Sequence, residues 1–100
     1  MSVYTKLVRD KIPKILDESG VLYESWTATD AEYKDELVKK LIEETGEFME
    51  DSSVEELADV IEVVLALQKL PEYADVESVR RAKLEERGGF ENKVILTGEK

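Results

Sequence analysis

The sequence predicts an all-α fold, a bundle of four helices in which two long central helices run antiparallel. Three features predict it: apolar residues recur at spacings of three and four over two long segments, capping residues precede both segments, and glycine or proline follows three of the four helices. Charged residues form 38% of the chain and hydrophobic residues 42%, as in a helical domain with a solvated exterior. Residues 1–100 form one domain with a modest core, so we expect an oligomer to complete the bundle.

Two long helices form the predicted centre. The first is expected over residues 29–50, where Thr29 opens a capping box of the form T-x-x-E. The second is expected over residues 53–70, where Ser53 and Glu56 make another possible capping box, and a proline follows its end. Because this second helix is apolar on nearly every side, it is either buried within the domain or covered at a subunit contact.

Shorter elements flank the central pair. A short helix is expected over residues 13–19, with proline in its first turn. Residues 21–28 are too few for a stable strand and are expected to form an extended connection. A fourth helix is expected over residues 75–87, ended by Gly88 and Gly89. We expect this helix to turn its apolar residues inward: Val76, Val79, Ala82 and Leu84.

The composition excludes several classes of function. With 24 acidic and 14 basic residues the net charge is −10, which argues against affinity for a nucleic acid polymer or an anionic membrane. Without Cys or His, the chain has no thiolate nucleophile, no disulfide and no usual zinc site. Catalysis would depend on carboxylates, Lys, Arg, hydroxyl groups or a metal. The N-terminus lacks the apolar core of a signal peptide, and no stretch approaches a membrane span, so we expect a cytoplasmic protein without a membrane partner.

Acidic residues gather on one face of each central helix. Glu43, Glu44 and Glu47 share a face with Lys40 in the first, and Glu56 and Asp59 are three apart in the second. Like charges at such spacings repel, and a divalent cation offsets that repulsion directly. A site made only of carboxylates suits Mg²⁺ or Mn²⁺ rather than zinc or iron, which favour imidazole and thiolate.

Other interpretations of these acids remain open. An acidic run on a helix is usually a solvated face, and Glu43, Glu44 and Lys40 fit ordinary surface pairs. Glu56 fits the capping box with its serine. Asp59 is harder to explain locally, because a poor helix former stands there among apolar residues.

Three separated segments resemble a known superfamily. EETGE followed by ELAD is similar to the E-E-x-x-E … E-x-x-D signature of the all-α nucleoside triphosphate pyrophosphohydrolases, which include the MazG-like proteins. The opening YTKLVRDKIP and the closing KLEERGGFENKVIL resemble its phosphoribosyl-ATP pyrophosphohydrolase-like branch, so that nearly the whole chain is covered. Eight residues separate Glu47 from Glu56, fewer than in many MazG-like members, so we expect a tight connection between the helices.

The resemblance implies a four-helix MazG-like bundle that assembles as a dimer or tetramer and hydrolyses a nucleotide substrate. It implies Mg²⁺, with Mn²⁺ possible, held by Glu44, Glu47, Glu56 and Asp59, while Glu43 and Glu44 serve catalysis by supporting the metal and positioning water. Basic residues are assigned to substrate phosphate: Lys6, Arg9, Lys11, Lys40, Lys83 and Arg87. The alternatives for these are solubility and, for Arg87, a favourable cation at a helix C-terminus. Trp26 or Tyr23 would stack on a base, unless either is a core or interface residue.

The expected reaction is cleavage between the α and β phosphates, giving a nucleoside monophosphate and pyrophosphate, in a house-cleaning role toward non-standard nucleotides. One alternative is a phosphoribosyl-ATP pyrophosphohydrolase activity. Another is a non-catalytic helical dimer or binding module with acidic faces.

Overall fold

The computed structural model describes residues 4–99. In that range the chain forms helices and no strand, which confirms the predicted all-α class. The elements are α1 (Ile12–Glu18), α2 (Asp30–Glu50), α3 (Val54–Gln68), the short 3-10 helix η1 (Pro71–Tyr73) and α4 (Val76–Arg87). Each of the four helices predicted from the sequence is present.

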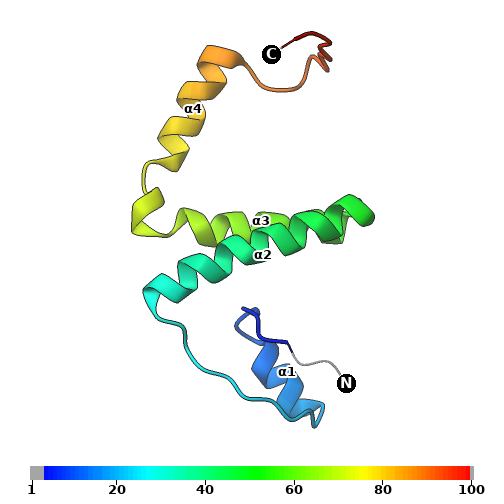
Figure 1. The fold of residues 1–100 in the computed structure, drawn as a ribbon, viewed down its shortest axis with the longest axis vertical. Helices are drawn as coiled ribbons and strands as arrows, with labels where there is room; N and C mark the ends of the chain where they lie inside the picture. Colours follow the sequence, from blue (N-terminus) through cyan, green and yellow to red (C-terminus); the bar gives the residue numbers. More distant parts are fainter. Residues whose placement is uncertain (1–3, 100) are drawn as a thin grey trace.

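Helices α2 and α3 form an antiparallel hairpin, the only pair of described elements with extensive contacts (Figure 1). Its core is small: Leu37 on α2 and Val63 on α3 are the buried hydrophobic residues of the described chain, at 3% and 7% exposed. The connection between the helices is tight, as expected, because only residues 51–53 separate them. The hairpin therefore fixes one face of α2 against one face of α3.

Capping hydrogen bonds set where these two helices begin. At α2 both bonds of the predicted capping box are present: Glu32 N–H donates to Thr29 Oγ1 at 3.2 Å, and Thr29 N–H donates to a Glu32 carboxylate oxygen at 2.9 Å. At α3 only half of the predicted box forms, since Glu56 N–H donates to Ser53 Oγ at 3.2 Å and Ser53 N–H donates instead to Asp51 O. The side chain of Glu56 is thus left to another role.

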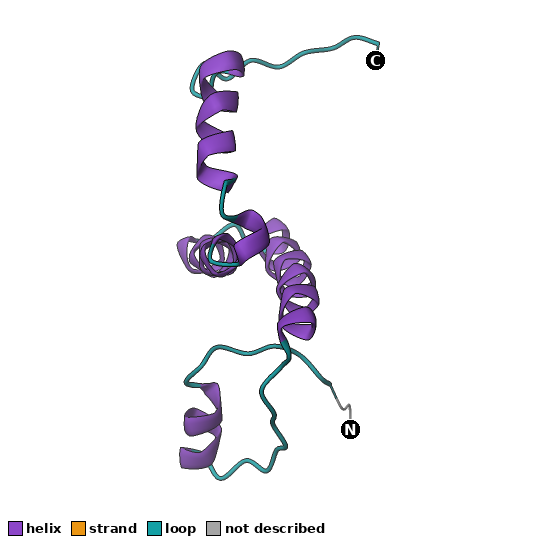
Figure 2. Cartoon of the chain, turned by 90° about the vertical axis from the view of Figure 1, so that its left-hand side faces the viewer, coloured by secondary structure: helices purple, strands orange, loops and turns teal. Residues whose placement is uncertain are grey.

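Helix α4 does not pack in the way that the sequence predicts. All its residues are exposed, and Val76, Val79 and Leu84, expected to face inward, are 39–50% exposed. The helix leads away from the hairpin, and the segment after it extends further still (Figures 1 and 2). Gly88 adopts φ +79° where α4 ends, a conformation that glycine adopts without strain. Within one chain the four helices are therefore not a closed bundle.

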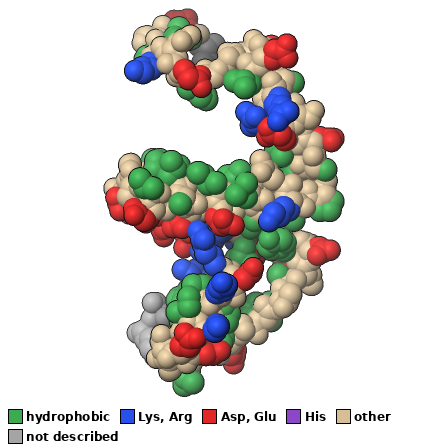
Figure 3. Space-filling model, turned by 180° about the vertical axis from the view of Figure 1, so that it is seen from behind, with side chains coloured by type: hydrophobic (Ala, Val, Ile, Leu, Met, Phe, Trp, Pro, Cys, Tyr) green, Lys and Arg blue, Asp and Glu red, His purple; other side chains and the backbone are tan. Residues whose placement is uncertain are grey.

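The apolar surface of α3 is covered on one side only. Leu57, Ile61 and Leu65, spaced four apart, are each 44–49% exposed. Of the two alternatives for this helix, burial within the single chain is wrong. Figure 3 shows the resulting division of the hairpin, with hydrophobic side chains gathered along one edge and acidic side chains along the opposite edge.

Candidate metal centre

Three carboxylates from the two helices of the hairpin converge on one point. Glu44 comes from α2, and Glu56 and Asp59 come from the first two turns of α3. One oxygen of each lies within 4.8 Å of the others. The antiparallel arrangement explains the meeting: Glu44 and Asp59 lie at similar distances along the chain from the connection, while Glu56 and Asp59 share a face at a spacing of three.

Burial of these carboxylates lowers the stability of the folded state unless a hydrogen-bond donor or a cation compensates for the lost hydration. Glu44 is only 8% exposed, and one of its carboxylate oxygens, Oε2, is buried without a hydrogen-bond partner. Oε2 of Glu56 is likewise buried without a hydrogen-bond partner. A buried oxygen that lacks a partner loses its hydration without compensation, and the penalty is larger for a charged group. The cluster therefore contains two buried oxygens in need of a donor or a cation, and the three residues could hold a metal ion.

The pKa values of Glu43 and Glu44, which are neighbours on α2, are shifted in opposite directions. Burial raises the pKa of Glu44, the neighbouring carboxylates of Glu47 and Asp59 raise it further, and Lys40 opposes the change. The pKa of Glu43 is lowered, mainly because Lys40 donates a hydrogen bond to it at 3.1 Å. Glu43 is thus held as a carboxylate, whereas Glu44 favours its proton more strongly than an ordinary glutamate.

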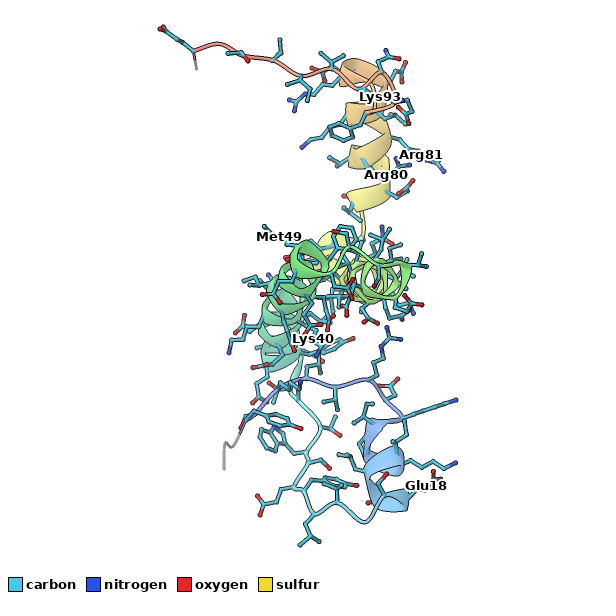
Figure 4. All side chains as sticks on the ribbon, turned by 90° about the vertical axis from the view of Figure 1, so that its right-hand side faces the viewer. Glu18, Lys40, Met49, Arg80, Arg81 and Lys93 are labelled. Carbon is cyan, nitrogen blue, oxygen red and sulfur yellow. The ribbon has the colours of Figure 1, made fainter. Side chains whose placement is uncertain are left out.

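Two cations that pair with these acids come from the segment that precedes α1, and a third comes from α2. Arg9 Nη2 lies 2.7 Å from Asp59 Oδ1, and Lys6 Nζ lies 3.5 Å from Glu43 Oε1. Lys40 joins them from α2, 3.5 Å from Glu44 Oε1. Figure 3 shows Lys and Arg side chains beside the acidic edge of the hairpin, and Figure 4 shows Lys40 on the side of α2 next to the N-terminal segment. The predicted basic residues Lys6, Arg9 and Lys40 therefore lie beside the predicted acids.

A cleft of about 430 Å³ lies between the N-terminal segment and the hairpin. Its walls combine carboxylates of the cluster with apolar and basic groups, and its size falls in the range of small-molecule sites. The apolar part includes Leu37 and Val63, the core residues of the hairpin. Further lining residues are Leu7, Val8, Arg9, Asp10, Lys11, Tyr33, Lys40, Glu44, Asp59, Glu62, Ala66 and Lys69. The cleft therefore borders the acidic cluster and offers positive charge to an anionic ligand.

The structure leaves some predicted site residues outside this arrangement. Glu47 is exposed and lies close enough to raise the pKa of Glu44, but it does not join the group of three oxygens. Lys83 and Arg87 stand on α4 and do not line the cleft; Figure 4 shows Arg80 and Arg81 of the same helix far from Lys40. Neither aromatic candidate lines the cleft, since the Tyr23 hydroxyl donates to Asp17 at 2.8 Å and Trp26 is 68% exposed.

Several lining residues were not predicted as site residues from the sequence, among them Glu62, Tyr33 and Lys69. Glu62 stands three residues after Asp59, so the helical spacing that groups Glu56 with Asp59 also points to it. Tyr33 and Lys69 carry no such signal, because they reach the cleft only through the pairing of α2 with α3. The Arg9–Asp59 ion pair joins residues 50 apart in the chain and likewise needs the fold.

The chain matches no family model, no curated protein and no solved structure. No helix among residues 4–99 is long and apolar enough to cross a membrane.

Proposed function

We propose that the protein is a divalent-cation-dependent nucleotide pyrophosphohydrolase of the MazG-like kind, which cleaves a nucleoside triphosphate to the monophosphate and pyrophosphate. The observation that carries the proposal is the convergence of Glu44, Glu56 and Asp59 within 4.8 Å, with two buried oxygens that lack partners. The sequence signature that contains these residues supports the same assignment.

The donor set supports Mg²⁺ as the cation, with Mn²⁺ as a substitute. All three groups are carboxylates, and the chain has neither His nor Cys to favour zinc or iron. Glu47, at the border of the cluster, is the candidate for a fourth ligand. Bound there, the cation would neutralise phosphate charge and lower the pKa of a bound water.

The chain's own residues would supply the rest of the chemistry. Arg9, Lys11 and Lys69, which line the cleft, would bind and orient the phosphate chain. Glu43, held ionised by Lys40, would accept a hydrogen bond from water and orient it toward phosphorus. Leu37 and Val63 would exclude bulk water from the apolar part of the cleft. No nucleophilic side chain is required, which suits a chain without Cys.

We further propose that the working form is a dimer or a tetramer. The accessible surface is 9367 Å², against roughly 5,800 Å² for a compact monomer of this mass. The excess, on the order of 3,600 Å², is of the size that stable oligomers bury at their interfaces. The apolar side of α3 and the exposed apolar residues of α4 are the surfaces that a second copy would cover.

Pyrophosphate release over a panel of nucleoside and deoxynucleoside triphosphates, with Mg²⁺ or Mn²⁺, tests the proposed activity. Phosphoribosyl-ATP belongs in the panel, since turnover of that compound alone would assign the other branch of the superfamily. Glu56→Gln should abolish release, whereas Glu55→Gln, an exposed neighbour on the same helical turn, should keep it. Absence of release with every nucleotide and both cations would leave a binding module and refute the enzyme.

A further inference from the structure

The Arg9 guanidinium is paired with one of the three carboxylates of the acidic cluster. It comes from the segment before α1, 50 residues away in the chain, and makes a 2.7 Å ion pair with Asp59, one of the three converging carboxylates. It satisfies Oδ1 of that residue alone. The buried Oε2 atoms of Glu44 and Glu56 keep no partner. Arg9 is therefore an incomplete counter-ion for the cluster.

We propose that Arg9 is a tethered counter-ion that competes with a divalent cation for Asp59, so that cation binding releases the guanidinium into the adjoining cleft. The inference rests on the proposed metal centre and adds to it a means by which the chain controls its own cation affinity. Competition follows from charge: a cation held by Asp59 and its two neighbours would stand beside the guanidinium and repel it.

The surroundings of Arg9 favour exchange over permanent pairing. The Arg9 and Asp59 side chains are 57% and 40% exposed, so water can replace either partner when the pair separates. Arg9 also lines the cleft, so its released guanidinium needs only a change of side-chain rotamer to meet an anionic ligand there. Lys6, 3.5 Å from Glu43, is a separate contact between the segment and the hairpin that does not depend on Arg9.

The same geometry predicts an order of events. Without a cation, Arg9 is engaged with Asp59 and a ligand phosphate meets a cleft whose carboxylates are only partly neutralised. With a cation, the carboxylates are neutralised and Arg9 is available to the phosphate. Cation and anionic ligand should then bind with positive coupling.

Titration calorimetry with Mg²⁺ or Mn²⁺ alone tests the competition. In Arg9→Gln the cation should bind about fivefold more tightly than in the wild type, since an exposed ion pair worth up to about 1 kcal/mol no longer has to be broken. Lys14→Gln is the matched control, because it removes the same charge from exposed α1 and should change the affinity less than twofold. A gain in Arg9→Gln no larger than that in Lys14→Gln would overturn the inference.

Nuclear magnetic resonance on the wild type tests whether Mg²⁺ releases Arg9 from Asp59, and it does not require a well-folded variant. The Nε–Hε signal of Arg9, assigned in the wild type by through-bond correlation to its own backbone, should move toward the position of free arginine as Mg²⁺ saturates the protein. Saturable binding that leaves this signal in place would contradict the release of Arg9 while preserving the metal centre. Absence of any saturable cation binding by the wild type would instead remove the metal centre, and the inference with it.

Discussion

At the residue scale, the sequence offers two roles for Glu56 at the start of α3: a partner in the helix cap and a ligand in the acidic cluster. The structure assigns these roles to different parts of the residue. Ser53 caps the helix by accepting from the Glu56 N–H, while the Glu56 carboxylate joins Glu44 and Asp59. The backbone of residue 56 thus belongs to the cap and its side chain to the cluster. Helix stability and cation binding should therefore respond to different substitutions.

Glu56→Gln should lower cation affinity and leave stability unchanged, whereas Ser53→Ala should lower stability and leave cation affinity unchanged. Glu56→Gln should fold as well as the wild type and lose most of its cation affinity, because hard cations prefer anionic oxygen. Ser53→Ala should lose about 1 kcal/mol of stability with every proposed ligand intact. Chemical denaturation and Mg²⁺ calorimetry on both variants measure these effects. The reverse pattern would make Glu56 a capping residue with no part in the cluster.

At the element scale, local signals predicted the helices well and their packing poorly. Capping residues, apolar spacing and proline or glycine punctuation depend on neighbours within one or two turns, so they identified α1 to α4 from the sequence. The meeting of Glu44 with Asp59 was predictable, because a short connection makes α2 and α3 antiparallel neighbours. The place of Arg9 was not, since an ion pair across 50 residues depends on how an irregular segment crosses the hairpin. The inward face predicted for α4 failed because periodicity does not say which surface will cover it.

The capping box of α2 should make the free energy of unfolding depend measurably on pH. Hydrogen bonds from Thr29 lower the pKa of Glu32, so its ionised form stabilises the folded state above the ordinary value of 4.5. That contribution should be lost as the pH falls through 4.5 and below, where the carboxylate takes up a proton. Glu32→Gln cannot titrate, so the stability difference between wild type and variant should narrow with acid. A difference that stays constant from pH 7 to about pH 3 would contradict the box.

At the scale of the whole molecule, the chain is more open than its length requires. Its radius of gyration is 17.8 Å, against about 13 Å for a compact domain of 100 residues. Apolar groups remain exposed on α3, on α4 and in the segment after it, where Phe90 is 96% exposed. The hydrophobic effect favours covering such surfaces, and residues 4–99 contain no further helix or strand to cover them.

The exposed stripe of α3 provides a test of assembly. Wild-type protein should sediment as a dimer or a larger oligomer at micromolar concentration, and Ile61→Lys, in the middle of the stripe, should shift it toward monomer. Leu22→Lys places the same charge on an exposed apolar position outside the hairpin and should leave the oligomer intact. A wild type that sediments as a stable monomer would contradict the proposed assembly.

The most direct test of the central claim is thermal unfolding with and without Mg²⁺, in the wild type and in the double variant Glu44→Gln, Glu56→Gln. A cation that binds only the folded state stabilises it by about 2.7 kcal/mol at 100 times its Kd. For a domain of this size the melting temperature of the wild type should then rise by roughly 10 °C or more. The double variant keeps side chains of the same shape without the two charges, so its melting temperature should not respond to Mg²⁺. An unresponsive wild type, or an equal rise in the double variant, would contradict a metal centre at Glu44, Glu56 and Asp59.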